Sequence, residues 1–174
     1  MLHLDMQIHN AAQKAPDNGV PNLFLKNIWV APAERLCVPQ QQIGERQPTQ
    51  PCILVVEDDA ALATLEAEIL RNHGYIVTTL PSGELAITAL HRAVPDLVVL
   101  DIELPGNVNG WQVLQTLRTL ARIPVLITSS STVAVRQYMR SRGETRGTLD
   151  HLPKPFPIQT FLKRVKRMLP ITDQ

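Results

Sequence analysis

The chain has 174 residues, of which 44% are hydrophobic and 19% are charged, and its formal net charge is +1 at pH 7. This composition predicts a soluble globular protein of one ordinary domain with an appendage, and it excludes a global field that would attract nucleic acid or a membrane. No apolar run approaches the roughly 18 residues that span a bilayer, and no basic leader precedes an apolar block at the N-terminus. We therefore expect a cytoplasmic protein without a membrane partner.

Residues 1–50 differ in composition and periodicity from the rest of the chain. They contain five prolines, a run of three glutamines and no sustained helical or strand period, which predicts a flexible extension. One apolar stretch within them, residues 22–31, is suited to docking. Cys37 and Cys52 lack metal-binding spacing, so we expect reduced thiols and no zinc site.

From residue 51 onward, strand-like and helix-like segments alternate five times. Short apolar runs predict strands at 52–56, 75–80, 96–100, 124–128 and, more weakly, 149–152. Helical periodicity predicts helices at 60–73, 82–92, 110–120, 132–142 and 158–169. Ser82 is suited to cap the second of these helices. The inward face of the first helix is expected to comprise Leu62, Leu65, Glu66, Ile69 and Leu70, and that of the second Leu85, Ala86, Ala89 and Leu90. Residues 51–170 are thus expected to form one α/β domain, followed by a short tail at 171–174.

The early strands are apolar at consecutive positions, not at every second one. Both of their faces are therefore expected to be buried, as in a parallel sheet with helices on both sides. Ligands of such sheets bind at the carboxyl ends of the strands, where the strand order reverses.

Acidic residues follow two of these strands. Glu57, Asp58 and Asp59 come after the first strand, while Asp101 and Glu103 come at the end of the third. If the two strands are neighbours, the carboxylates meet at one edge and repel one another unless a cation lies among them. Oxygen ligands favour Mg²⁺, with Mn²⁺ as the second choice. Asp59 is better explained as the N-cap of the helix that begins at residue 60.

Hydroxyl groups and a lysine follow the later strands. Residues 128–131 are Thr-Ser-Ser-Ser after the fourth strand, and Lys154 follows the fifth, in front of Pro155. An aspartate, a metal, a hydroxyl and a lysine around one point are typical of phosphoryl transfer, with the carboxylate as the nucleophile. Each signal alone is weak, and their ordered positions at four strand ends carry the prediction.

The segments ILVVEDD, DLVVLDIELPG, PVLITSS and LPKPF, in this order and spacing, resemble the receiver domain of two-component response regulators. The resemblance covers about residues 51–170. It implies a doubly wound, flavodoxin-like and CheY-like fold with strand order 2-1-3-4-5. It also implies a phosphorelay function, in which a sensor histidine kinase or a histidine phosphotransfer protein phosphorylates an aspartate.

The resemblance assigns a role to each acid of the expected site. Asp101 matches the phospho-acceptor, and Asp58 matches a direct Mg²⁺ ligand, with Glu57 acting through a water. The backbone carbonyl of Glu103 matches the remaining protein ligand. Lys154 matches the lysine that pairs with the phosphoryl group.

The same resemblance assigns two switch positions. Ser129 matches the switch hydroxyl, with Thr128 as the alternative if the strand is one residue shorter, and His151 stands where the family has an aromatic switch residue. Two segments depart from the family pattern. The loop from Asp101 to Gly110 is one residue longer than is common, and residues 140–151 replace the usual Gly-Ala-rich turn.

The sequence leaves the downstream target unknown and admits other functions. Basic residues at 136–146 and 163–167 lack interleaved aromatics and a groove-reading motif, so we expect no nucleic-acid partner. Only five residues follow the last expected helix, which predicts a stand-alone receiver without an output domain. The alternatives are a pseudo-receiver that binds partners without phosphate, and a Mg²⁺-dependent aspartyl-phosphate phosphatase, for which the usual second aspartate is missing.

Overall fold

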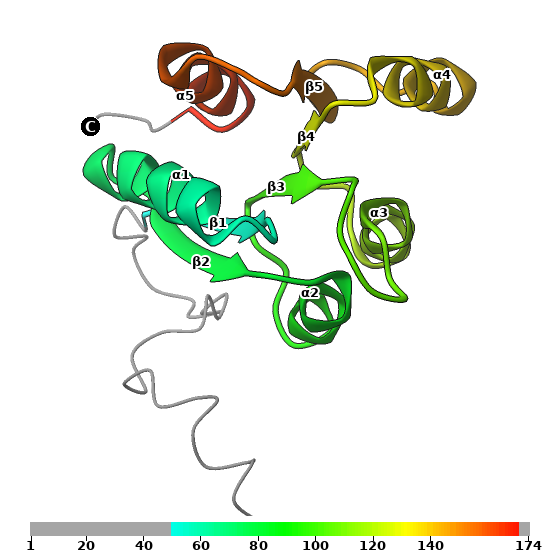
Figure 1. The fold of residues 1–174 in the computed structure, drawn as a ribbon, viewed down its shortest axis with the longest axis horizontal. Helices are drawn as coiled ribbons and strands as arrows, with labels where there is room; N and C mark the ends of the chain where they lie inside the picture. The colour runs from blue at the N-terminus through cyan, green and yellow to red at the C-terminus, as the bar shows by residue number, and fades with distance from the viewer. Residues whose placement is uncertain (1–49, 171–174) are drawn as a thin grey trace, which may run out of the picture. The chain divides into compact units, whose positions relative to one another are not determined.

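The computed structural model describes residues 50–170, which form a single parallel sheet with helices on both faces (Figure 1). The strands are β1 (Cys52–Val56), β2 (Ile76–Leu80), β3 (Leu97–Asp101), β4 (Val125–Ser129) and β5 (Leu149–Pro153). The helices are α1 (Ala60–Asn72), α2 (Gly83–Leu90), α3 (Gly110–Leu120), α4 (Thr132–Arg142) and α5 (Ile158–Met168). The strands pair in the order β2-β1-β3-β4-β5, so the predicted fold and strand order are confirmed.

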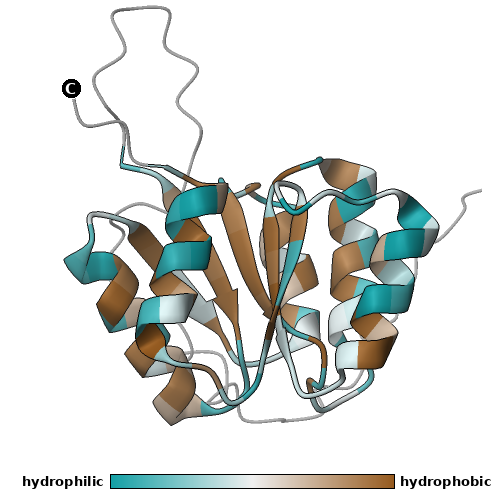
Figure 2. Ribbon diagram, turned by 90° about the horizontal axis from the view of Figure 1, so that it is seen from above, coloured by the Kyte–Doolittle hydropathy of each residue, from teal (hydrophilic) through white to brown (hydrophobic). Residues whose placement is uncertain are grey.

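Two separate cores lie on the two faces of the sheet. Helices α1 and α5 cover one face, and α2, α3 and α4 cover the other (Figure 1). Every residue of β3 and β4 is buried, as their continuous apolar runs predict. Figure 2 shows the hydrophobic residues gathered on the strands, with hydrophilic residues on the outer faces of the helices. The strand ends are thereby held rigidly at one edge of the sheet.

Local side chains fix where the helices begin. Asp59 caps α1, because its carboxylate accepts hydrogen bonds from the amides of Ala61 and Leu62. Ser82 caps α2 in the same manner, and Asn109 forms a capping box with Gln112 at the start of α3. The expected capping roles of Asp59 and Ser82 are confirmed. Helix α4 ends at Gly143, whose φ of 60° is a left-handed conformation that glycine adopts most readily.

The inward faces of α1 and α2 are narrower than the sequence predicts. Leu65 and Leu85, expected to point inward, are 43% and 40% exposed. On α1 the buried positions are instead Ala63, Glu66, Ala67 and Leu70. Two of these four residues are alanines, and the Leu65 side chain lies outside this buried face.

The remaining expectations concern the termini and the cysteines. The extension at 1–49 and the tail at 171–174 lie outside the described residues. Cys52 is disulfide-bonded, so the expectation of reduced thiols is wrong for this residue, and Cys37 lies outside the described part. Among residues 50–170 no helix has the length and apolar character needed to cross a membrane.

Candidate phosphoryl-acceptor site

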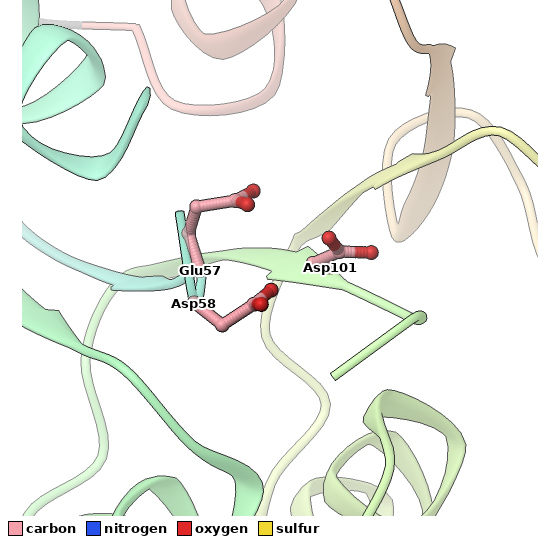
Figure 3. Close-up of side chains that lie close together, drawn as sticks. All are labelled: Glu57, Asp58 and Asp101. Carbon is pink, nitrogen blue, oxygen red and sulfur yellow. The ribbon is translucent and has the colours of Figure 1, made fainter. Parts of the chain in front are cut away.

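Three carboxylates meet at the carboxyl ends of β1 and β3. One ligand oxygen each from Glu57, Asp58 and Asp101 lies within 4.8 Å of the other two (Figure 3). The two strands are neighbours in register, with Val56 beside Leu100, so the residues that follow them come together. Glu57 and Asp101 are buried, whereas Asp58 is exposed and leaves the cluster open to solvent. The predicted juxtaposition of acids is present.

Lys154 supplies the positive charge of this cluster. Its ammonium lies 2.6 Å from Asp101 Oδ2 and 2.7 Å from Glu57 Oε2. The Lys154 backbone amide donates to the Ser129 carbonyl, which fixes the residue at the end of β5. Burial alone would lower the pKa of Lys154, but its hydrogen bonds to Asp101 and Glu57 outweigh burial, and the pKa is raised. Lys154 therefore stays charged beside the buried acids.

The ionised form of Glu57 is disfavoured relative to that of an exposed glutamate. Burial raises the pKa of Glu57, and the hydrogen bond and charge of Lys154 oppose that effect only in part, while the charge of Asp101 adds to it. A divalent cation at the cluster would favour the ionised form of this side chain. All the acidic donors are carboxylate oxygens, which is the donor chemistry that Mg²⁺ and Mn²⁺ prefer.

Two buried hydroxyls lie at the end of β4. The Ser129 hydroxyl accepts a hydrogen bond from the Ser131 amide at 3.0 Å, which leaves its own proton available to a group at the site. Thr128 pairs in register with Asp101, and its buried hydroxyl has no hydrogen-bond partner among the described residues. Both candidates for the switch hydroxyl thus border the cluster.

Glu103 connects two loops through its side chain. Its carboxylate accepts a hydrogen bond from the Ser130 hydroxyl, and its backbone amide donates to Asp101 Oδ1 at 2.7 Å. The sequence predicted only its backbone carbonyl as a functional atom. The side-chain bridge was missed because nothing in the local sequence pairs position 103 with position 130.

His151 lies on β5 beside Ile127 of β4. It is half-buried, and its Nε2 is 3.4 Å from the Ser129 carbonyl, at the long end of hydrogen bonding. Burial lowers the pKa of His151, which the nearby Ser129 carbonyl opposes. The neutral ring is therefore favoured at neutral pH in this conformation.

Glu66 is a buried acid that the sequence placed on the inner face of α1 without assigning it a role. Neither carboxylate oxygen has a hydrogen-bond partner among residues 50–170. Burial, and then the charge of Glu57, raise the pKa of Glu66 to about 8. An acid at an apolar position of a 3.6-residue repeat is the signal that would have found it.

The response regulator receiver domain model matches residues 53–166 of the chain. The chain belongs to the receiver domain family. The DNA-binding response regulator MtrA of Mycobacterium tuberculosis is 36% identical over 121 residues, which are 70% of this chain and 51% of MtrA. The transcriptional regulatory protein HprR of Escherichia coli is also 36% identical, over 67% of this chain and 51% of HprR.

Solved receivers have the same fold. A response regulator receiver protein from Sinorhizobium medicae has a TM-score of 0.60 and 29% identity, over 69% of this chain and 94% of that one. This chain is therefore a receiver domain of the two-component signalling class, and the predicted family is confirmed. Receiver domains are in general signalling modules.

The relatives overturn one prediction about partners. The chain spans about half the length of MtrA and HprR, and MtrA is named as DNA-binding. The expectation that nucleic acid is no partner is therefore contradicted. That expectation rested on the composition of the basic segments at 136–146 and 163–167 alone.

Proposed function

We propose that this receiver accepts a phosphoryl group on Asp101 from a sensor histidine kinase or a histidine phosphotransfer protein. The observation that carries the proposal is the buried Asp101 carboxylate, paired with Lys154 at 2.6 Å and grouped with two other acids. One Asp101 oxygen forms a bond to phosphorus, and the phosphorus–nitrogen bond of the donor's phosphohistidine breaks. The departing imidazole nitrogen takes a proton from solvent.

The surrounding residues hold the charges of this transfer. Lys154 moves its hydrogen bond from the Asp101 carboxylate to an oxygen of the incoming phosphoryl group, and Glu57 keeps the ammonium at the site. Asp58, Asp101 and the Glu103 carbonyl would hold Mg²⁺ or Mn²⁺ directly, and Glu57 would act through a water; the ion would supply further charge neutralisation. The exposed Asp58 gives the ion its route from solvent.

Phosphorylation then biases two conformations of the domain. The Ser129 hydroxyl donates to the phosphoryl group, which draws the end of β4 toward Asp101. His151 packs near the Ser129 carbonyl and follows that movement between inward and outward rotamers. Its neutral ring, favoured by burial, suits the inward position.

Incubation with Mg²⁺ and acetyl phosphate tests the acceptor. Wild type should gain one acid-labile phosphoryl group by intact-protein mass spectrometry, and Asp101→Asn should gain none. Asp59→Asn is the matched control, because asparagine also caps helices and Asp59 lies outside the proposed ligand set. Absence of phosphate on wild type, with partner binding indifferent to Mg²⁺ and to Asp101→Asn, would instead establish the pseudo-receiver.

We further propose that the signal is read out at DNA, since the relatives include a DNA-binding regulator and a transcriptional regulator. Chromatin immunoprecipitation of wild type and Asp101→Asn should differ in the sites recovered. A fluorescence anisotropy titration with duplex from a recovered site separates direct binding of this chain from recruitment by a partner. If neither protein recovers any DNA site, the proposed DNA readout is contradicted.

A further inference from the structure

The loop between β3 and α3 carries the proposed metal ligand Glu103 and is one residue longer than the common family spacing. Gly106 within it has φ of 100°, a backbone conformation that glycine tolerates best. The next two backbone amides, of Asn107 and Val108, point to one shared acceptor. Successive amides arranged in this manner form a concave binding site for an anion.

Glu84 of α2 fills this anion site. Its Oε1 accepts from the Asn107 amide at 3.0 Å and from the Val108 amide at 3.1 Å. Its own backbone amide and then that of Asn107 lower the pKa of Glu84, so the carboxylate is charged at neutral pH. A residue 23 positions earlier in the chain therefore clamps the middle of the loop.

Helix α2 packs closely against the loop, which places the Glu84 side chain beside the two amides. A Cβ added at Gly83 would lie 2.2 Å from the Val108 carbonyl oxygen, so the first turn of α2 directly contacts the loop. A Cβ at Gly106 would come within 3.0 Å of Glu84 Oε1. Glycines at both positions allow the carboxylate and the two amides to meet.

The two ends of the loop are tied to the nucleophile. At the start, the Glu103 amide donates to Asp101 Oδ1, and at the end, the Gly110 amide donates to the Ile102 carbonyl. Gly110 also lies against the Asp101 carbonyl, where a Cβ would approach to 2.1 Å. In the described part of the chain, the side-chain hydrogen bonds to the centre of the loop, residues 106–108, come from Glu84.

From these contacts we infer that Glu84 is a positioning residue for the phosphoryl-acceptor site. It holds the enlarged loop in one conformation and so keeps the Glu103 backbone carbonyl in place for the divalent cation. This role rests on the proposed function, because it acts on the proposed metal ligand. Glu84 itself touches neither Asp101 nor the donor, and it works through the backbone of the loop.

Three variants separate the clamp from a general effect of charge. Glu84→Ala removes the acceptor, whereas Glu84→Gln removes the charge and keeps an amide oxygen that both backbone amides can reach. Glu68→Ala is the matched control, since Glu68 is an exposed acid on α1 and lies outside the clamp. Hydrogen exchange followed by NMR without metal reports on the amides of Asn107 and Val108, and calorimetric titration with Mg²⁺ reports on the cation.

Glu84→Ala should speed exchange of the two amides by about tenfold or more and weaken Mg²⁺ binding about tenfold, as is typical when a partner of a metal ligand is lost. Glu84→Gln should stay within about threefold of wild type in both measurements, because its amide oxygen still accepts from both backbone amides; the small loss reflects the weaker hydrogen bonds of a neutral acceptor. Glu68→Ala should match wild type.

Two results would overturn the inference. If Glu84→Ala leaves both amide exchange and Mg²⁺ affinity unchanged, the clamp does not exist. If Glu84→Gln loses as much Mg²⁺ affinity as Glu84→Ala, long-range charge explains the effect and positioning does not. A wild type that takes no phosphoryl group from acetyl phosphate would overturn the proposed function as well, and that assay is independent of the Glu84 variants.

Discussion

Glu57 and Glu66 are both almost fully buried glutamates at the β1–α1 end of the domain, yet their surroundings differ. Glu57 contacts the Lys154 ammonium at 2.7 Å, while Glu66 has no hydrogen-bond partner for either oxygen among the described residues. Burial raises the pKa of both side chains, and that of Glu66 reaches about 8. The comparison teaches that burial sets the cost of a charge, whereas a partner decides whether the charge persists.

The difference predicts a strong pH dependence of stability that originates at Glu66. The folded pKa of about 8 lies above the usual value of 4.5, so the folded state binds the proton more tightly. The free energy of unfolding is therefore highest below about pH 4.5 for this group, and it declines as pH rises toward 8. The full gap corresponds to about 5 kcal/mol.

Glu66→Gln tests this prediction, because glutamine is isosteric and does not titrate. Urea unfolding should give similar free energies for the two proteins at pH 5, and a variant more stable by about 3 to 5 kcal/mol at pH 8.5. The exposed Glu68→Gln should leave the pH profile unchanged. A Glu66→Gln profile parallel to that of wild type between pH 5 and 8.5 would show that Glu66 is not the titrating group.

Removing the Lys154 ammonium should leave Glu57, like Glu66, without a partner for its charge. Lys154→Met keeps most of the side-chain volume but leaves Glu57 and Asp101 facing each other without a positive charge. We expect a loss of about 2 to 3 kcal/mol in the free energy of unfolding at pH 7 without metal. Millimolar Mg²⁺ should restore a large part of it.

Lys163→Met is the control for Lys154→Met, since Lys163 is exposed on α5. If Lys154→Met unfolds at the same urea concentration as wild type in metal-free buffer, the ammonium does not offset the repulsion between the acids. Equal losses with and without Mg²⁺ would argue against a shared cation site.

The elements that the sequence predicted well are those whose signal is local. Continuous apolar runs predicted β3 and β4 because both faces of these strands are buried. The convergence of the acids was predicted by a rule of topology, since parallel neighbours bring their carboxyl ends to one edge. In contrast, the contacts of Glu84 with the amides at 107 and 108 join distant segments and have no local signal.

Helix faces were predicted less accurately than helix positions. The inward side of α1 was correctly centred near Glu66 and Leu70, but Leu65 is 43% exposed. Periodicity gives the direction of a helix face and not its width, which depends on how closely the helix approaches the sheet. The burial of Glu66 was implied by that periodicity, while its lack of a partner required the structure.

The two glutamates should also differ in their effect on metal binding. Glu57→Gln removes a proposed ligand and should weaken Mg²⁺ affinity about tenfold, equivalent to about 1.4 kcal/mol. Glu66→Gln should change the affinity by less than about twofold near neutral pH, because the Glu66 carboxyl is then largely protonated. Calorimetric titration of both variants at pH 7 decides this, and equal losses would place Glu66 in the metal site.

The smallest predicted effect is the coupling between the two regions. The charge of Lys154 lowers the pKa of Glu66, but burial and the charge of Glu57 raise it by more. In Lys154→Met, the pH at which Glu66 titrates should therefore rise, by an amount worth less than about 1 kcal/mol. A double-mutant cycle of Lys154→Met with Glu66→Gln, measured by urea unfolding at pH 8.5, gives this coupling directly. The Lys154→Met loss should be smaller in the Glu66→Gln background than in the wild-type background, because Lys154 there stabilises one charged acid fewer. A larger loss in that background would mean that Glu66 and Lys154 interact through packing and not through charge.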